Sequence, residues 1–145
     1  MLRFKFAAVL LLGACYRSDV GNATNGNLYS AYDSARSHTE LTATGRVTRV
    51  LGLREGRSGV HEGFLVLAPY RCAPASPGAC RKQITVRIED NVSITGEVPL
   101  HPGQLVTVHG QYEYNPQGGV IHWTHHDPAG RHENGYVEIG GKRYQ

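Results

Sequence analysis

Several features that would identify an enzyme or a membrane-spanning protein are missing from this 145-residue chain. It contains no His-Glu-x-x-His zinc signature, no Gly-x-Ser-x-Gly nucleophile elbow and no glycine-rich loop of the kind that cradles phosphate. Its apolar run from Phe6 to Leu12 is too short to cross a bilayer as a helix. No signature of a known reaction therefore assigns an activity to the chain.

A strong excess of one charge is missing too. The 15 Lys and Arg residues are nearly balanced by 12 Asp and Glu, which gives a formal net charge of +3. Basic residues are scattered, with doublets only at Arg81-Lys82 and Lys142-Arg143. A protein that binds nucleic acid mainly through its phosphates usually carries a basic patch or stripe. The composition disfavours that class, although a local groove could still be basic.

The first residues have the pattern of an export signal. Arg3 and Lys5 precede the apolar run, and Gly13 and Ala14 come directly before Cys15. Small residues before a cysteine resemble the lipobox of bacterial lipoproteins, in which the signal is removed and the cysteine is acylated. We therefore expect residues 1–14 to be a lipoprotein signal peptide and Cys15 to be a lipid anchor. The alternative is an ordinary secretory signal that leaves Cys15 as a thiol.

A lipid anchor would place the protein in the bacterial cell envelope, attached to a membrane and facing the periplasm or the cell surface. Tyr16 follows Cys15, and it is not the aspartate associated with inner-membrane retention, so the outer membrane is favoured. Removal of residues 1–14 would leave 13 basic and 12 acidic residues, a net charge of about +1.

Two cysteines then remain, which is an even number in an exported protein. Cys72 and Cys80 bracket a turn-rich loop, and we expect them to form a disulfide. Closing so short a ring would contribute about 2.5 kcal/mol in the chain-entropy model. A metal-binding cysteine pair is the alternative, but the chain has no second pair to complete such a site.

The chain from residue 15 to residue 40 is expected to form a tether and one short helix. Gly, Asn, Asp and Ser dominate its first part, which has no apolar periodicity. Asn27 to Ser37 could form the helix, because Leu28, Tyr29, Tyr32 and Ala35 cluster at helical spacing and Asn27 could cap it.

Residues 41–145 show the pattern of a single all-β domain. Short segments with period two alternate with Gly and Pro, and Ile84, Val86 and Ile88 give the clearest alternation. Five main strands with a long, bent first strand favour a small OB-fold-like barrel, and a small β-sandwich is the alternative. The expected strands are Thr42 to Leu53 with a bulge or bend, Val60 to Leu67, Ile84 to Ile88, Leu105 to Tyr114 and Val120 to about His126, followed by a hairpin from Tyr136 to Tyr144.

Half of the eight histidines fall in one short segment beside the only tryptophan, Trp123. Alternation along a strand would place Trp123 and His125 on one face and His122 on the other. A metal site would therefore need the turn after this strand to bring Asp127 or His132 back. On this interpretation His122, His125, Asp127 and His132 are candidate ligands of a divalent metal, which could support phosphodiester hydrolysis.

Two other interpretations stay open. In the structural one, Trp123 fills the core, His125 bonds internally and Asp127 caps the turn into Pro128. In the binding one, the loops between strands one and two and between strands four and five flank the ligand face of an OB-fold. Side chains on or near those loops could then meet an anionic or glycan ligand. These candidates are Arg54, Arg57, His61, Tyr112 and Tyr114.

The barrel segment also resembles a known family. The resemblance covers about residues 42 to 145 and is most specific in His122-Trp123-Thr124-His125-His126-Asp127-Pro128, with Val60 to Phe64, Val108 to Asn115 and Gly118 to Ile121 also similar. The chain resembles a bacterial family catalogued as domain of unknown function 3465. That resemblance implies a small exported protein and no particular activity. The Cys72 to Cys80 loop looks like an insertion relative to the family.

Overall fold

A computed structural model describes residues 25–71 and 81–145. The expected signal peptide, the lipid-bearing Cys15 and the disulfide between Cys72 and Cys80 lie outside these residues. No helix in the described ranges is long and apolar enough to cross a membrane.

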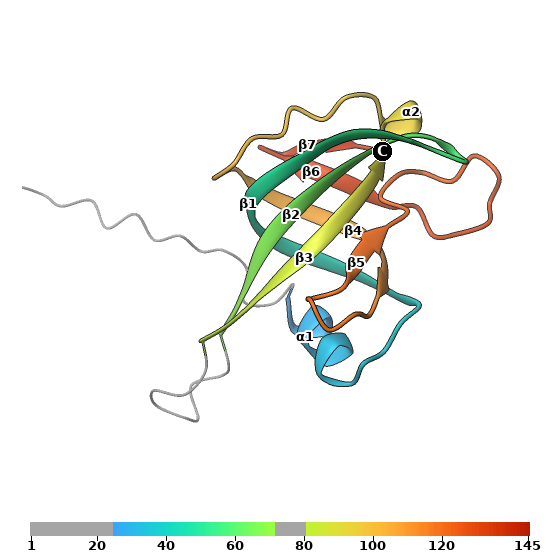
Figure 1. The fold of residues 1–145 in the computed structure, drawn as a ribbon. Helices are drawn as coiled ribbons and strands as arrows, with labels where there is room; N and C mark the ends of the chain where they lie inside the picture. The colour runs from blue at the N-terminus through green and yellow to red at the C-terminus, as the bar shows by residue number, and fades with distance from the viewer. Residues whose placement is uncertain (1–24, 72–80) are drawn as a thin grey trace, which may run out of the picture.

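Five strands close into one barrel, shown in Figure 1. They are β1 (Thr39–Gly56), β2 (Gly59–Arg71), β3 (Arg81–Asn91), β4 (Leu105–Glu113) and β5 (Val120–His122). Their order around the ring is β1-β2-β3-β5-β4, and β1 closes it by pairing with β4. Only the β3–β5 pair among these is parallel. The closed ring confirms the OB-fold-like barrel and excludes the sandwich.

Strand β1 is the long, bent strand that the sequence predicts. Its first half pairs with β4 from Thr39 to Arg46, and its second half pairs with β2 from Arg46 to Gly56. The β1–β2 register shifts twice, between Val47 and Arg49 and between Val50 and Gly52, where φ is +87°. These bulges let one strand belong to both sides of the ring.

The side chains that alternate inward fill the barrel. Ile84, Val86 and Ile88 of β3 are buried, as their spacing predicts. The hairpin of β6 (Tyr136–Ile139) and β7 (Lys142–Tyr144) extends the sheet beyond β4, also as predicted. The largest fully buried apolar side chains are Leu28, Phe64, Ile88, Tyr112 and Ile121.

Two helices lie near opposite ends of the barrel (Figure 1). α1 (Gly26–Asp33) buries Leu28 and Tyr29, and α2 (Val92–Thr95) directly follows β3. The helix predicted from the sequence ran from Asn27 to Ser37, with Asn27 as its cap, whereas α1 begins and ends earlier. The N-cap residue is instead Asn25, whose amide makes tertiary hydrogen bonds to the backbone of Thr44 and Pro69 rather than a helix cap.

The expected fifth strand is shorter than predicted. β5 ends at His122 because Trp123 adopts φ +55°, a left-handed conformation that turns the chain away from the ladder. Trp123 is consequently 36% exposed, while Thr124 and His125 are buried. The prediction that Trp123 fills the core is therefore wrong, and residues 123–135 form a loop between β5 and β6, called below the 123–135 loop.

Candidate functional site

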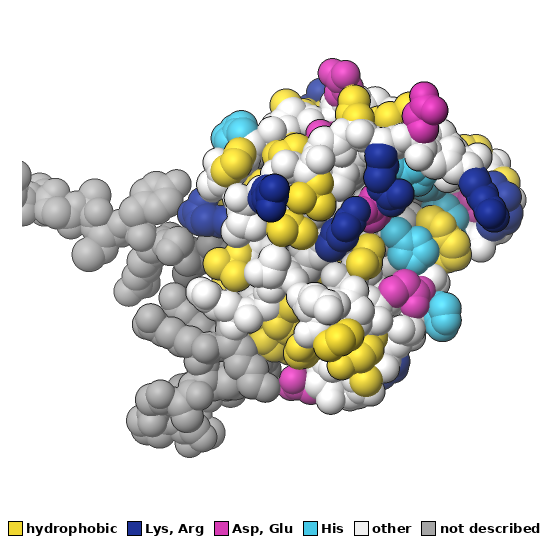
Figure 2. Space-filling model, viewed as in Figure 1, with side chains coloured by type: hydrophobic (Ala, Val, Ile, Leu, Met, Phe, Trp, Pro, Cys, Tyr) yellow, Lys and Arg dark blue, Asp and Glu magenta, His cyan; other side chains and the backbone are white. Residues whose placement is uncertain are grey.

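A cleft of about 840 Å³ opens on the outside of the barrel. It lies between the tip of the β1–β2 hairpin, the end of β3 and the 123–135 loop. Figure 2 shows basic and histidine side chains gathered on the right of the face that it draws. The residues lining the cleft include Arg54, Arg57, His61, Glu89, His122, Trp123, His125, Asp127, Arg131 and His132.

The cleft lining carries three arginines, Arg54, Arg57 and Arg131, against two carboxylates, Glu89 and Asp127, so positive charge is in excess. Glu89 is buried, and its carboxylate accepts hydrogen bonds from both Arg54, at 2.9 Å, and Arg87. Neither Arg57 nor Arg131 forms an ion pair with another residue in the described ranges. Glu89 is thus engaged by two guanidiniums, whereas Arg57 and Arg131 remain able to bind an incoming anion.

Aromatic rings form one wall of the cleft. The Trp123 indole stacks on the His132 imidazole, with ring centroids 4.7 Å apart and an interplanar angle of 12°. The His122 ring lies 4.8 Å from Trp123 at a tilted angle, and the His125 ring meets His132 edge-on at 5.0 Å. The histidine-rich segment therefore forms a continuous surface of rings.

Asp127 holds the 123–135 loop in shape. Its carboxylate accepts backbone N–H groups from Ala129 at 2.8 Å, from His132 at 2.7 Å and from Arg131. Desolvation alone would raise the pKa of Asp127, but these hydrogen bonds outweigh it and lower that pKa to about 2. Asp127 thus has the turn-capping role of the structural interpretation, with three backbone N–H groups bound to its two oxygens.

A second aspartate anchors the same loop from inside the barrel. Asp90 is fully buried and accepts hydrogen bonds from the hydroxyls of Thr95 and Thr124, both at 2.7 Å. Burial raises the pKa of Asp90, and the two hydroxyls partly offset this rise. No sequence motif singled out this residue.

The four candidate metal ligands all line the cleft, but they do not converge on one point. His125 and His132 each bond through Nδ1 to a backbone carbonyl at 2.7 Å. His122 Nε2 lies 3.5 Å from a carboxylate oxygen of Glu113 without hydrogen-bond geometry. Within residues 25–71 and 81–145, the group with convergent ligand atoms is a different one, Glu40, His109 and Glu133.

The predicted ligand-binding residues divide into two groups. Arg54, Arg57 and His61 line the cleft together, as expected for the first loop of an OB-fold. Tyr112 is instead fully buried, and its hydroxyl donates to the Gly118 carbonyl at 3.3 Å. Burial raises the pKa of Tyr112 to about 12. Tyr114 packs against Tyr32, 5.7 Å between ring centroids, and neither tyrosine borders the cleft.

Comparison with known proteins places the chain in a family. Residues 9–145 match the family described as "Protein of unknown function (DUF3465)", so the chain belongs to that family, as its motifs predicted. No curated protein matches it. A solved structure, the small single-stranded DNA-binding protein of Streptomyces coelicolor, is similar with a TM-score of 0.45 and 18% identity, over 58% of this chain and 84% of that one.

Proposed function

We propose that this member of the DUF3465 family is a binding protein whose cleft takes up an anionic ligand with planar rings, of which single-stranded nucleic acid is the best fit. One observation carries the proposal: two arginines without ion-pair partners among residues 25–71 and 81–145 border the same cleft as a wall of indole and imidazole rings. Single-stranded nucleic acid is typically bound by this combination, because phosphates pair with guanidiniums and bases stack on rings.

The position and size of the cleft agree with this proposal. In OB-folds the loop between the first two strands borders the ligand face, and here that loop carries Arg57 and Ser58. A volume of about 840 Å³ falls in the range of ligand pockets, about 300–1,000 Å³. A neutral glycan could stack on the rings but could not form ion pairs with the arginines, so the charge favours a polyanion.

Trp123 provides a direct test, because it is the chain's only tryptophan and it lies in the cleft wall. Titration of a short oligothymidylate at low salt should quench its fluorescence and raise the anisotropy of a labelled oligonucleotide. Arg57→Ala should weaken binding, whereas Arg36→Ala, a matched change at an exposed arginine outside the cleft, should not. A saturable response to a neutral oligosaccharide but none to oligonucleotide would refute the proposal.

Degradation of the oligonucleotide on addition of divalent ions would instead favour the metal-dependent nuclease considered from the sequence. In that event the His122, His125, Asp127 and His132 group would be the first to mutate. A denaturing gel that follows the amount of full-length labelled strand distinguishes binding from hydrolysis.

We further propose that this binding domain lies at a bacterial envelope, held to a membrane by lipid on Cys15, with the outer membrane favoured. The signal-like pattern of residues 1–14 supports this placement. Cys15→Ala should release the protein from the membrane fraction, and persistence there would refute the anchor. A disulfide between Cys72 and Cys80 belongs to the same proposal, and a native mass showing both thiols free would exclude it.

A further inference from the structure

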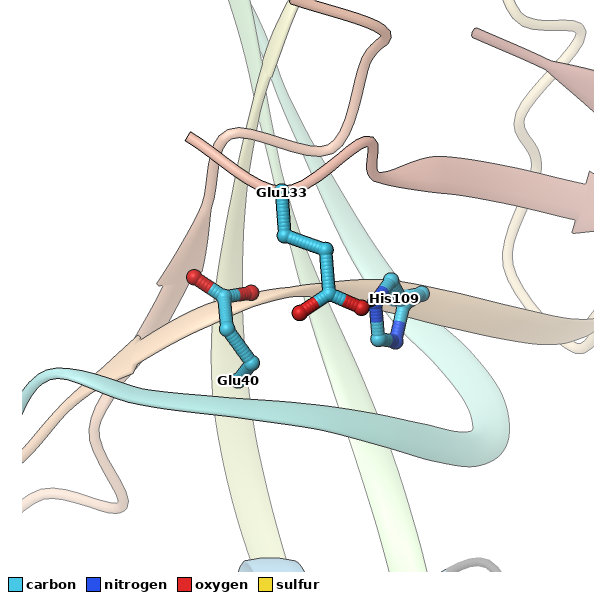
Figure 3. Close-up of side chains that lie close together, drawn as sticks. All are labelled: Glu40, His109 and Glu133. Atoms are coloured by element: carbon cyan, nitrogen blue, oxygen red, sulfur yellow. Dashed lines mark hydrogen bonds and ion pairs between the residues drawn. The ribbon is translucent and has the colours of Figure 1, made fainter. Parts of the chain in front are cut away.

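We propose that Glu40, His109 and Glu133 bind a divalent transition-metal ion, with zinc as the best fit, at a site separate from the cleft. The three residues come from β1, β4 and the 123–135 loop, and their ligand atoms all lie within 4.8 Å of one another. Figure 3 shows Glu133 reaching from the loop toward the other two side chains. None of the three lines the cleft.

The β1–β4 ladder brings the first two ligands together. Thr42 pairs with His109 and Glu40 pairs with Gln111, so Glu40 and His109 are diagonal neighbours on the outward face of this antiparallel pair. The loop then places a Glu133 carboxylate oxygen 3.2 Å from His109 Nε2. Ligands of a tetrahedral zinc ion lie about 3.3 Å apart, given bonds of about 2.0–2.1 Å. This pair therefore already has the separation of two ligands of one ion.

The imidazole of His109 is oriented as a ligand needs to be. Its Nδ1 lies 2.9 Å from the Thr42 hydroxyl, and its ring stacks on Tyr136 with centroids 5.5 Å apart. In the tautomer that donates Nδ1–H to Thr42, the lone pair of Nε2 points toward the carboxylates. Metal-binding histidines are usually fixed in this way by a partner on the other nitrogen.

Glu40 provides an independent sign that a cation is needed. Gln111 donates to its Oε1 at 3.3 Å, but its Oε2 is buried and lacks any hydrogen-bond partner within the described structure. A buried carboxylate oxygen without a partner is costly, and buried polar atoms normally have one. A metal ion between Glu40 and Glu133 would satisfy this oxygen and would relieve the repulsion between the two carboxylates.

The donor set indicates the kind of metal. One imidazole nitrogen with carboxylate oxygens suits zinc and related first-row ions, whereas calcium and magnesium prefer oxygen ligands alone. Three protein ligands leave a position of a tetrahedral ion open to water. Glu133 is 59% exposed, so an ion can reach the site from solvent.

Zinc binding by the full chain tests the inference, measured by competition with a chromophoric chelator. We expect one zinc per chain, with affinity reduced at least tenfold by Glu133→Gln. Because the Glu133 side chain is exposed, this substitution should leave the fold intact. Glu97→Gln, a matched change at an exposed glutamate elsewhere, should bind like the wild type. Thr42→Val should weaken binding about 10- to 100-fold, since its hydroxyl orients the histidine.

Cobalt substitution gives a second readout, because tetrahedral Co²⁺ absorbs visible light strongly. The absorption should appear in the wild type and disappear in His109→Gln. Absence of stoichiometric zinc in the wild type would overturn the inference. Zinc binding that is retained in Glu133→Gln but lost in a His125→Gln, His132→Gln double variant would also overturn it, because the metal would then bind in the cleft. Neither result depends on whether the cleft binds oligonucleotide.

Discussion

Replacement of Arg57 by alanine tests the electrostatic part of the proposed function quantitatively. Arg57 and Arg131 are the cleft arginines without ion-pair partners in the described structure, whereas Arg54 already shares Glu89 with Arg87. For single strands, each phosphate neutralised by a cation contributes about −0.7 to the slope of log affinity against log salt. Two contacts predict a slope of about −1.4, and Arg57→Ala should reduce it to about −0.7.

These slopes differ enough to measure. Over a tenfold rise in salt concentration, a slope of about −1.4 weakens binding about 25-fold, whereas a slope of about −0.7 weakens it about fivefold. The affinity should be followed by quenching of Trp123 and, independently, by the anisotropy of a labelled oligothymidylate. Arg36→Ala controls for the general loss of one positive charge, since this arginine does not line the cleft.

Equal decreases of the slope in Arg57→Ala and Arg36→Ala would refute the proposed role of Arg57, because the attraction would then come from net charge rather than from the cleft. A wild-type affinity that is independent of salt would also refute it. That result would leave stacking on the ring wall as the whole interaction and would point to an uncharged ligand.

Three further changes test the architecture around the loop. Gly135→Ala should destabilise the protein by about 2–3 kcal/mol in urea denaturation, because a Cβ would overlap the Trp123 carbonyl and lie 2.6 Å from that of His109. The pKa of Asp90 is raised in the folded state, so its contribution to stability is present at acidic pH and is lost as the pH rises through the folded-state pKa. Asp90→Asn should remove this loss in urea titrations that run upward from about pH 4, near the ordinary pKa of an aspartate. The pKa of Asp127 is lowered to about 2, so its contribution is present above pH 4 and is lost as pH falls toward 2; Trp123 fluorescence should report this change in the wild type and not in Asp127→Asn.

Most of the barrel could be predicted because alternation along a strand directly reflects burial. The apolar positions of β3 and the glycines of β1 predicted the inward face and the bend correctly. The same alternation puts Tyr112 on one strand face with Val106 and Val108, and all three are buried. Tyr112 is near a loop, but its place in this alternation buries it and keeps it out of the cleft.

The candidate site was only partly predictable, for two physical reasons. Arg54, Arg57 and His61 could be placed because a hairpin tip lies close to its own strands. The positive φ of Trp123 could not be predicted, because a non-glycine residue adopts it only when tertiary contacts over-determine it. Glu40, His109 and Glu133 are distant in sequence, and only the β1–β4 pairing and the path of the loop bring them together.

The 123–135 loop links the two proposed sites. Trp123 and His132 contribute rings to the cleft, while Glu133 points toward the other two proposed metal ligands. His132 and Glu133 are successive residues, and the His132 Nδ1 bonds to the Glu133 carbonyl at 2.7 Å. A metal held by Glu133 would therefore restrain the ring that stacks on Trp123. Zinc should tighten oligonucleotide binding in the wild type and leave it unchanged in Glu133→Gln, and an equal effect of zinc on both proteins would show that the two sites are independent.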